Sequence, residues 1–346
     1  MKHTYLIGEI GQNHNGSVEI AKQLIDEVAR PSIDDLFGTR LKPMDAIKLT
    51  KRDLNEELSK SAMLKPYNNP NSFGKTYGEH RAFLELDEEQ HLELYRYAKE
   101  KNLDVVETLC SGGCLNLLNY FIPDRLKVAS RDLTNLPLLE KMAETKIPII
   151  LSTGMGGKKE LDNALNIITK YHTDISILHC LSQYPAEYQN INLRTITYLK
   201  KQYPQFRIGY SDHSIGIVVP AVAVGLGAEI IEKHITLDRN MKGTDHRSSL
   251  GIDGIHRMVR DIRNIEESMG EEKMFISEAV LETRIKLERS VATIRDIAEG
   301  ETITDGDIHM LSPGDGYRWA ERSQVIGKKA KVMIPEDEII YPNMIE

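Results

Sequence analysis

Cysteine is scarce in this chain of 346 residues, which contains three. An odd number without framework spacing excludes a disulfide-stapled fold and suits a reducing compartment, so we expect reduced thiols and a cytoplasmic protein. Cys110 and Cys114 do not make a zinc site by themselves, because no second pair stands at ligand spacing.

The chain also lacks an excess of positive charge and a long apolar run. Lys and Arg total 44 against 52 Asp and Glu, a formal net charge of −8. This balance argues against a nucleic-acid partner or a membrane-surface role, although an anionic small molecule needs only a few local cations. The most apolar stretch, Ile217 to Ala228, is too short to span a bilayer and contains Pro220. Glu9 interrupts the apolar run near the N-terminus, so we expect no signal peptide.

What the sequence does contain is a regular alternation of short runs rich in Val and Ile with amphipathic stretches. The predicted strands are Tyr5–Gly11, Ala46–Thr50, Val105–Cys110, Leu126–Ser130, Ile149–Gly154, Ile175–Leu181, Arg207–Ser211 and Glu229–Ile235. The predicted helices include Ser17–Arg30, Asp87–Lys101, Leu136–Thr145, Lys158–Tyr171, Asn192–Tyr203 and Asp253–Met269. Helices of this length between strands indicate parallel pairing. We therefore predict an α/β protein with a TIM (β/α)8 barrel; the alternative, a doubly wound open sheet, would need fewer strands.

The character of the sequence changes after Gly270. We predict a barrel domain over residues 1–270, a charged linker over 271–288 and a small β-rich domain over 289–346. In the last part, Ile297–Ile303 and Ile334–Ile340 look alike, as though one turn-and-strand unit were used twice. Arg30–Pro43 and Lys51–Leu86 are predicted as irregular loops, and the second is long and polar.

Polar or ionisable side chains end the predicted strands, where a TIM barrel builds its active site. They are Glu9, Lys48, Thr108, Lys127, Ser130, Asp132, Ser152, Thr153, His179, Ser182, Ser211, Asp212, His213 and His234. A single polar residue at a strand end could be explained by contact with solvent, but the recurrence of such residues on every strand favours a functional site.

Two lysines, Lys48 and Lys127, stand in the middle of apolar runs. A lysine is almost never fully buried unless it is paired, and Glu9, Asp132 or an anionic substrate could pair with these two. An internal ion pair with Glu9 is one alternative, and Schiff-base chemistry is another.

His213 and His234 end neighbouring strands, so their imidazoles can converge. Two imidazoles with nearby oxygen donors suit a divalent ion such as Mn²⁺, although a structural role for each histidine is the alternative. The Gly154–Gly157 run lacks the Lys-Ser/Thr of a phosphate loop. The segment ending at Ser17 is typical of a turn and a helix N-cap.

Nine segments carry a resemblance to a known family. They are Glu9–Gly16, Lys127–Ser130, Leu133–Leu139, Leu151–Met155, Leu178–Cys180, Tyr184–Pro185, Gly209–His213, Glu232–His234 and Leu237–Asn240. In this order, and nearly from end to end, the chain resembles the sialic acid synthases and their nonulosonic acid relatives. Its C-terminal part resembles the antifreeze-like (SAF) domain of these enzymes, with Ser312–Gly316 in the place of a substrate-facing loop.

The resemblance implies a metal-assisted condensation of phosphoenolpyruvate with an open-chain N-acetylated amino sugar, N-acetylmannosamine or a relative. The residues that it implies for phosphoenolpyruvate are Lys48, Thr108, Lys127, Ser130, Ser182 and Ser211. It implies a divalent metal (Mn²⁺, Mg²⁺ or Co²⁺) on His213 and His234, with Tyr184 and Asp245 at the sugar. It also implies a domain-swapped homodimer in which the tail of one subunit caps the barrel of the other.

We expect Glu9, Asp132 and His234 to take part in catalysis, with Glu9 or Asp132 managing protons. Two other classes compete with this reading: a Schiff-base aldolase or lyase using Lys48 or Lys127, and a non-catalytic sugar-binding protein.

Three departures from the family pattern bear on the sugar. Thr50 stands where Gln is common, Arg131 and Asp132 follow Ser130 where a small residue is usual, and Ser312 replaces an Arg of the tail loop. We expect Arg131 to lie beside the sugar site. It either forms a salt bridge with a neighbour such as Asp132 or Asp104, or recognises an acidic or unusually substituted sugar.

Overall fold

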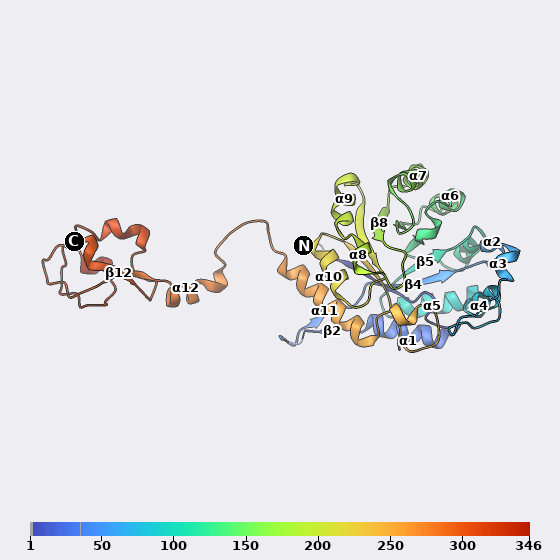
Figure 1. Cartoon of the computed structure of the whole chain (residues 1–346), viewed down its shortest axis with the longest axis horizontal. Coiled ribbons are helices and arrows are strands. Elements are labelled where there is room, and N and C mark those ends of the chain that lie inside the picture. The colour runs from blue at the N-terminus through green and yellow to red at the C-terminus, as the bar shows by residue number, and fades with distance from the viewer. Residues whose placement is uncertain (1–2, 35) are drawn as a thin grey trace. The chain divides into compact units, whose positions relative to one another are not determined.

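The computed structural model describes residues 3–34 and 36–346, and Figure 1 traces the chain from end to end. The chain forms two compact units, Met1–Gly270 and Glu271–Glu346, and each has its own hydrophobic core. Within the described residues, no helix combines the length and the apolar character that crossing a bilayer requires.

The first unit is a closed barrel of parallel strands (Figure 1). In their order around the barrel, the strands are β1 (Tyr5–Glu9), β10 (Ile230–His234), β9 (Arg207–Asp212), β8 (Ile175–Cys180), β7 (Ile149–Ser152), β6 (Arg125–Val128), β5 (Asp104–Leu109) and β4 (Ala46–Lys51). Strand β1 closes the barrel by pairing with both β10 and β4. The predicted TIM barrel is therefore confirmed, and the open sheet is excluded.

Helices connect consecutive strands and pack their apolar faces on the outside of the barrel. Helix α1 (Val18–Ala29) begins at Ser17, whose hydroxyl accepts a hydrogen bond from the amide of Ile20, as an N-cap does. The other predicted helices are α5 (Glu88–Glu100), α6 (Leu136–Glu144), α7 (Lys158–Ile168), α9 (Arg194–Gln202) and α11 (Ile252–Ser268). Short 3-10 turns lie at Gly113–Asn119, Ser130–Asp132 and His246–Ser248.

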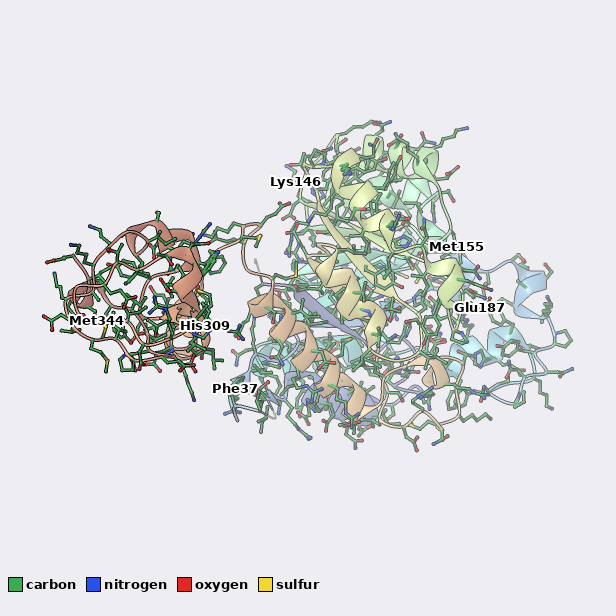
Figure 2. All side chains as sticks on the ribbon, turned by 60° about the vertical axis from the view of Figure 1, so that its left-hand side comes forward. Phe37, Lys146, Met155, Glu187, His309 and Met344 are labelled. Carbon is green, nitrogen blue, oxygen red and sulfur yellow. The ribbon has the colours of Figure 1, made fainter. Side chains whose placement is uncertain are left out.

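Several elements were not predicted. Helices α8 (Tyr188–Ile191) and α10 (Val218–Gly225) follow β8 and β9, and α10 tolerates Pro220 because it lies in the first turn. The segment 51–86 is not a plain loop, since it contains α2 (Leu54–Glu57), α3 (Lys60–Met63) and α4 (Tyr77–Phe83), each with a side-chain N-cap. Between α1 and β4, the antiparallel strands β2 (Ser32–Ile33) and β3 (Arg40–Leu41) form a hairpin that carries Phe37, labelled in Figure 2.

Two layers of side chains fill the inside of the barrel. The lower layer is an apolar cluster of Ile7, Ala46, Val106, Ile150, Leu178 and Ile230. Because successive residues of a strand point to opposite faces, the side chain two positions later also faces inward. On the same six strands those side chains are Glu9, Lys48, Thr108, Ser152, Cys180 and Glu232. The barrel interior therefore changes from apolar to ionisable within one layer, toward the carboxyl ends of its strands.

The second unit is built around β11 (Ser290–Thr293) and β12 (Ile308–Leu311), which pair antiparallel, and it includes α12 (Leu281–Leu287). Its 3-10 turns are Glu278–Val280, Asp305–Asp307, Trp319–Gln324 and Pro342–Met344. The two similar segments meet where Ile297 and Ile334 exchange backbone hydrogen bonds of 2.8 and 2.9 Å. Gly300 and Asp337, at equivalent positions, both have left-handed backbone angles (φ 78° and 61°). The repeated unit is therefore present as a turn between two isolated β-bridges, although neither copy contains a regular strand.

Candidate active site

A cavity of about 500 Å³ lies at the carboxyl ends of the barrel strands, and the upper, ionisable layer forms its floor. Met155, which lines it, and Glu187 lie on the same side of the barrel in Figure 2. The predicted site residues that line this cavity are Glu9, Lys48, Thr108, Lys127, Ser130, Arg131, Ser182, Tyr184, Ser211, His213, His234 and Asp245. Ser152, another of the polar residues at the strand ends, also lines it, whereas Asp132, Thr153, His179 and Asp212 do not.

Two lysines and two carboxylates form a buried network on the cavity floor. Lys48 Nζ lies 2.7 Å from Glu9 Oε2 and 3.5 Å from Glu232 Oε2. Lys127 Nζ lies 3.7 Å from the other carboxylate oxygen of Glu232. Lys48 is 6% exposed and Lys127 is 2% exposed. The internal ion pair between Lys48 and Glu9 is present, and it lies inside the cavity rather than away from it.

Burial and charge act on this network in opposite directions. Burial raises the pKa of Glu9 to about 7, against the attraction of Lys48. Burial also acts to raise the pKa of Glu232, but the attraction of Lys127 and Lys48 outweighs it and lowers this pKa. Glu9 is therefore a carboxyl that can exchange a proton near neutral pH, while Glu232 stays ionised between two lysines.

Hydroxyl groups surround the lysines. Thr108 Oγ1 lies 3.5 Å from Lys48 Nζ, and Ser211 donates a hydrogen bond of 2.8 Å to Glu232. The serines Ser130 and Ser182 converge because Gly154 stands between them without a side chain. A Cβ on Gly154 would lie 2.6 Å from Ser182 Oγ and 2.8 Å from Ser130 Oγ. The glycine run after β7 thus makes room for two hydroxyls.

Two imidazoles stand above the floor. His213 Nδ1 donates to the carbonyl of Leu181 at 2.7 Å, which leaves Nε2 as the nitrogen with a free lone pair. Burial lowers the pKa of His234, and its buried Nδ1 has no hydrogen-bond partner among the described residues. The two ring centres are 5.6 Å apart, and the Tyr184 ring packs 4.0 Å from that of His213.

The two histidines could supply only part of the coordination sphere of a metal ion. Within residues 3–34 and 36–346, no group of three or more His, Cys, Asp or Glu side chains is arranged to hold an ion. Two imidazoles, one of them oriented by a backbone carbonyl, suit an ion that takes its other ligands from substrate and water.

Of the two residues that follow Ser130, Arg131 forms the expected salt bridge with Asp132, whereas Asp132 does not line the main cavity. The Arg131 guanidinium lies 2.7 Å from Glu57 and 3.2 Å from Asp132, whereas Asp104 lies near Lys99 instead. Asp132 itself lines a neighbouring cavity of about 270 Å³ and not the main one. Since two carboxylates neutralise Arg131, the structure favours the salt-bridge account of this residue over acid recognition.

Known proteins share this architecture. Residues 42–274 match the NeuB family, and residues 288–346 match the SAF domain. The chain belongs to the NeuB family. It is 32% identical over 344 residues to the N-acetylneuraminate-9-phosphate synthase of Homo sapiens, an alignment that covers 99% of this chain and 92% of that protein. It is 33% identical over 343 residues to the N,N'-diacetyllegionaminic acid synthase of Campylobacter jejuni, covering 98% and 99%.

A solved structure of a synthetase of this type has the same fold. The N-acetylneuraminic acid (sialic acid) synthetase from Leptospira borgpetersenii, in complex with citrate, matches with a TM-score of 0.66 and 32% identity. The match covers 82% of this chain and 90% of that one. These relatives are named as synthases of sialic-type acids, so the family and the enzyme class predicted from the strand-end motifs are confirmed.

Sequence reasoning missed part of this NeuB-family cavity. The residues that it did not select include Gln12, Arg52, Arg81, Cys180, Glu232 and Thr244. Counting two residues beyond Leu178 and Ile230, which face inward, would have found Cys180 and Glu232. Arg52 and Arg81 come from the segment after β4, where no periodic pattern assigns a direction to side chains.

Proposed function

We propose that this NeuB-family chain condenses phosphoenolpyruvate with an open-chain N-acetylated amino sugar to give a nonulosonic acid and phosphate. The observation that carries the proposal is the pair of buried lysines, Lys48 and Lys127, on a cavity floor rich in hydroxyls. Phosphoenolpyruvate is small and strongly anionic, so it needs this combination of positive charge and hydrogen-bond donors.

The phosphoenolpyruvate site consists of the lysines and the hydroxyls around them. Its proposed members are Lys48, Thr108, Lys127, Ser130, Ser182 and Ser211. Before the anion arrives, Glu9 and Glu232 hold the lysines in place and stabilise their charged forms. Because the pKa of Glu9 is already raised to about 7, this carboxyl can take up a proton as a further negative charge approaches.

The condensation forms one carbon–carbon bond and breaks one carbon–oxygen bond. The enol carbon attacks the aldehyde carbon of the sugar, and the carbonyl electron pair moves to its oxygen, which takes a proton. Water then adds to the oxocarbenium-like centre, which forms a new carbon–oxygen bond, and loses a proton. As the carbon–oxygen bond to the bridging oxygen breaks, the new hydroxyl becomes the keto group and its proton passes to the departing phosphate. We assign the proton given to the sugar oxygen and the proton taken from water to Glu9, which is buried beside Lys48. Asp132 instead holds Arg131.

The remaining cavity residues serve the sugar. His213 and His234 would hold the divalent ion, with Mn²⁺, Mg²⁺ and Co²⁺ as candidates. When bound, such an ion supplies Lewis-acid polarisation of the sugar carbonyl oxygen. Tyr184, whose ring packs against His213, provides an aromatic face for the polyol chain, and Asp245 provides a hydrogen-bond acceptor.

We further propose a domain-swapped homodimer in the cytoplasm, in which the SAF unit of one subunit caps the barrel of its partner. Met274, Phe275 and Ile276, just beyond Gly270, are more than half exposed, which is typical of apolar residues that an assembly covers. The three cysteines are free thiols, which fits a reducing compartment.

A direct test measures phosphate release from phosphoenolpyruvate with a panel of N-acetylated hexosamines and aldose phosphates, with and without Mn²⁺. We expect release that requires both an acceptor and the ion. A Schiff-base reaction is the second candidate, because burial lowers the pKa of Lys127 and so favours its nucleophilic form. Borohydride trapping of substrate on the protein, with turnover indifferent to chelators, would favour that candidate. Sugar binding without phosphate release would indicate a non-catalytic protein.

A further inference from the structure

One cation in the active-site cavity differs from the others. Of the described side chains that line the cavity, Lys48, Lys127, Arg52, Arg81 and Arg131 carry positive charge. Four of them lie beside carboxylates, at distances from 2.7 to 3.7 Å. Arg81 has no such partner among the described residues. Its charge is available for a ligand.

A neutral group holds Arg81 in place. Its Nε and Nη2 donate to the hydroxyl of Tyr77 at 2.8 and 2.6 Å, and its guanidinium carbon lies 5.0 Å from the centre of the Tyr77 ring. Both residues belong to α4, which begins with a capping box between Thr76 and Glu79. The Tyr77 hydroxyl therefore orients the guanidinium without neutralising it, and Nη1 has no partner in the described part of the chain.

Arg81 stands on the sugar side of the cavity. The carbonyl of Phe83, at the end of α4, lies against Gly16 of the loop after β1, where a Cβ would be 2.5 Å away. The ammonium of Lys242 lies 4.9 Å from the centre of the Phe73 ring, which itself stacks on Phe83 at 4.5 Å. The segment that carries Arg81 thus rests on the loop after β10, which also supplies Asp245 to the cavity wall.

The position of Arg81 decides which part of a substrate it can reach. The aldehyde carbon must approach phosphoenolpyruvate at the cavity floor, where Lys48 and Lys127 are almost completely buried. Arg81 is only partly buried and belongs to α4, in the segment that follows the carboxyl end of β4. A group that contacts Arg81 therefore belongs to the far end of the open sugar chain.

We infer that Arg81 is a specificity-determining residue that receives an anionic group, a phosphate ester or a carboxylate, at the end of the acceptor remote from its aldehyde. The inference rests on the proposed condensation. A guanidinium binds trigonal or tetrahedral oxyanions through charge-assisted, often bidentate hydrogen bonds, and it gains little from a neutral hydroxymethyl group.

The experiment supplies each sugar of the acceptor panel in three forms: neutral, as the 6-phosphate and as the uronic acid. Phosphate release gives kcat/KM for each form with the native enzyme, Arg81→Gln, Arg81→Lys and the control Arg96→Gln, which removes an exposed arginine of α5 outside the cavity. We expect the native enzyme to prefer one charged form. Arg81→Gln should lower the charged-to-neutral ratio about 10- to 100-fold, the loss of one charge-assisted interaction. Arg81→Lys should keep part of the preference, and Arg96→Gln all of it.

Ionic strength provides a second readout. Added salt should raise the KM of the charged acceptor for the native enzyme more than for Arg81→Gln, because the partly exposed pair is screened. The 6-phosphate and uronic acid arms distinguish the two oxyanions. A native preference for the neutral sugar, or an unchanged ratio in Arg81→Gln, overturns the inference and leaves the condensation standing. No phosphate release with any acceptor overturns the condensation itself.

Discussion

The variant Lys48→Met separates two roles of the buried network of lysines and carboxylates: its contribution to stability and its contribution to phosphoenolpyruvate binding. Lys48 is 6% exposed, and its Nζ lies 2.7 Å from a carboxylate oxygen of Glu9 and 3.5 Å from one of Glu232. Removing one partner of a buried ion pair costs about 3–5 kcal/mol when a charge is left behind. Here Glu232 keeps Lys127 at 3.7 Å, and Glu9 has a pKa already raised to about 7 and can be protonated. We therefore expect the lower end, about 3 kcal/mol, or a fall in Tm of about 6 °C for a chain of this size.

The effect on the reaction should be larger and of a different kind. Lys48→Met should raise the KM for phosphoenolpyruvate about 10- to 100-fold, since a hydrogen bond to a charged group contributes about 1.5–3 kcal/mol. The double variant Lys48→Met/Glu9→Gln removes the stranded acid, so it should recover most of the Tm and none of the affinity. Thermal unfolding followed by circular dichroism measures the first effect. Steady-state phosphate release measures the second in Lys48→Met, and calorimetric titration with phosphoenolpyruvate measures it in the double variant, which lacks the carboxyl assigned to proton transfer.

A matched control lies on the same strand. Lys51 is also buried, at 8% exposed, but its ammonium donates to the carbonyl of Leu86 outside the cavity. Lys51→Met should lower Tm and leave the KM for phosphoenolpyruvate unchanged. Equal changes in KM for the two variants, or recovered affinity in the double variant, would refute the reasoning.

Two further variants and the removal of metal test other parts of the cavity and of the barrel. Gly154→Ala should raise the KM for phosphoenolpyruvate roughly tenfold, because its Cβ would overlap two serine hydroxyls, and unchanged kinetics would show that these hydroxyls do not bind the anion. Lys233→Met should lower Tm by about 6–10 °C, because it strands the fully buried Asp212 carboxylate, while a matching Asp212→Leu change should restore most of it; an unchanged Tm would contradict this. Chelation by EDTA should abolish turnover, and Mn²⁺, Mg²⁺ or Co²⁺ should restore it, whereas full activity in metal-free buffer would remove any role for the two imidazoles as ligands.

The barrel could be predicted because eight apolar runs, with helices between them, repeat one structural unit. The location of the active site could be predicted for the same reason, since the carboxyl ends of all strands of the barrel lie on one face. Glu232 was not predicted as a site residue because it lies within β10, two residues before His234 at the strand end. The alternation of inward-facing side chains that starts at Ile230 nevertheless leads to it. Where periodicity is strong, the sequence can predict both the fold and the direction of a side chain.

Other features depend on contacts between distant segments. The partner of Arg131 that was not predicted is Glu57, which lies 74 residues earlier in a stretch without periodic apolar positions. Helices α2, α3 and α4 are too short for an amphipathic pattern, and their caps are the main local signal. Helix α10 is apolar on nearly every residue, so it has no polar face that would reveal its period.

The central claim is that an enol carbon attacks the sugar and that phosphate leaves by cleavage of a carbon–oxygen bond. Phosphoenolpyruvate labelled with ¹⁸O at the bridging position tests this directly when the reaction is run with an accepted sugar and Mn²⁺ and both products are analysed by mass spectrometry. The account predicts that the label leaves with the released phosphate and that the organic product combines the carbon skeletons of both substrates. Label retained in pyruvate, with the sugar unchanged, would contradict it.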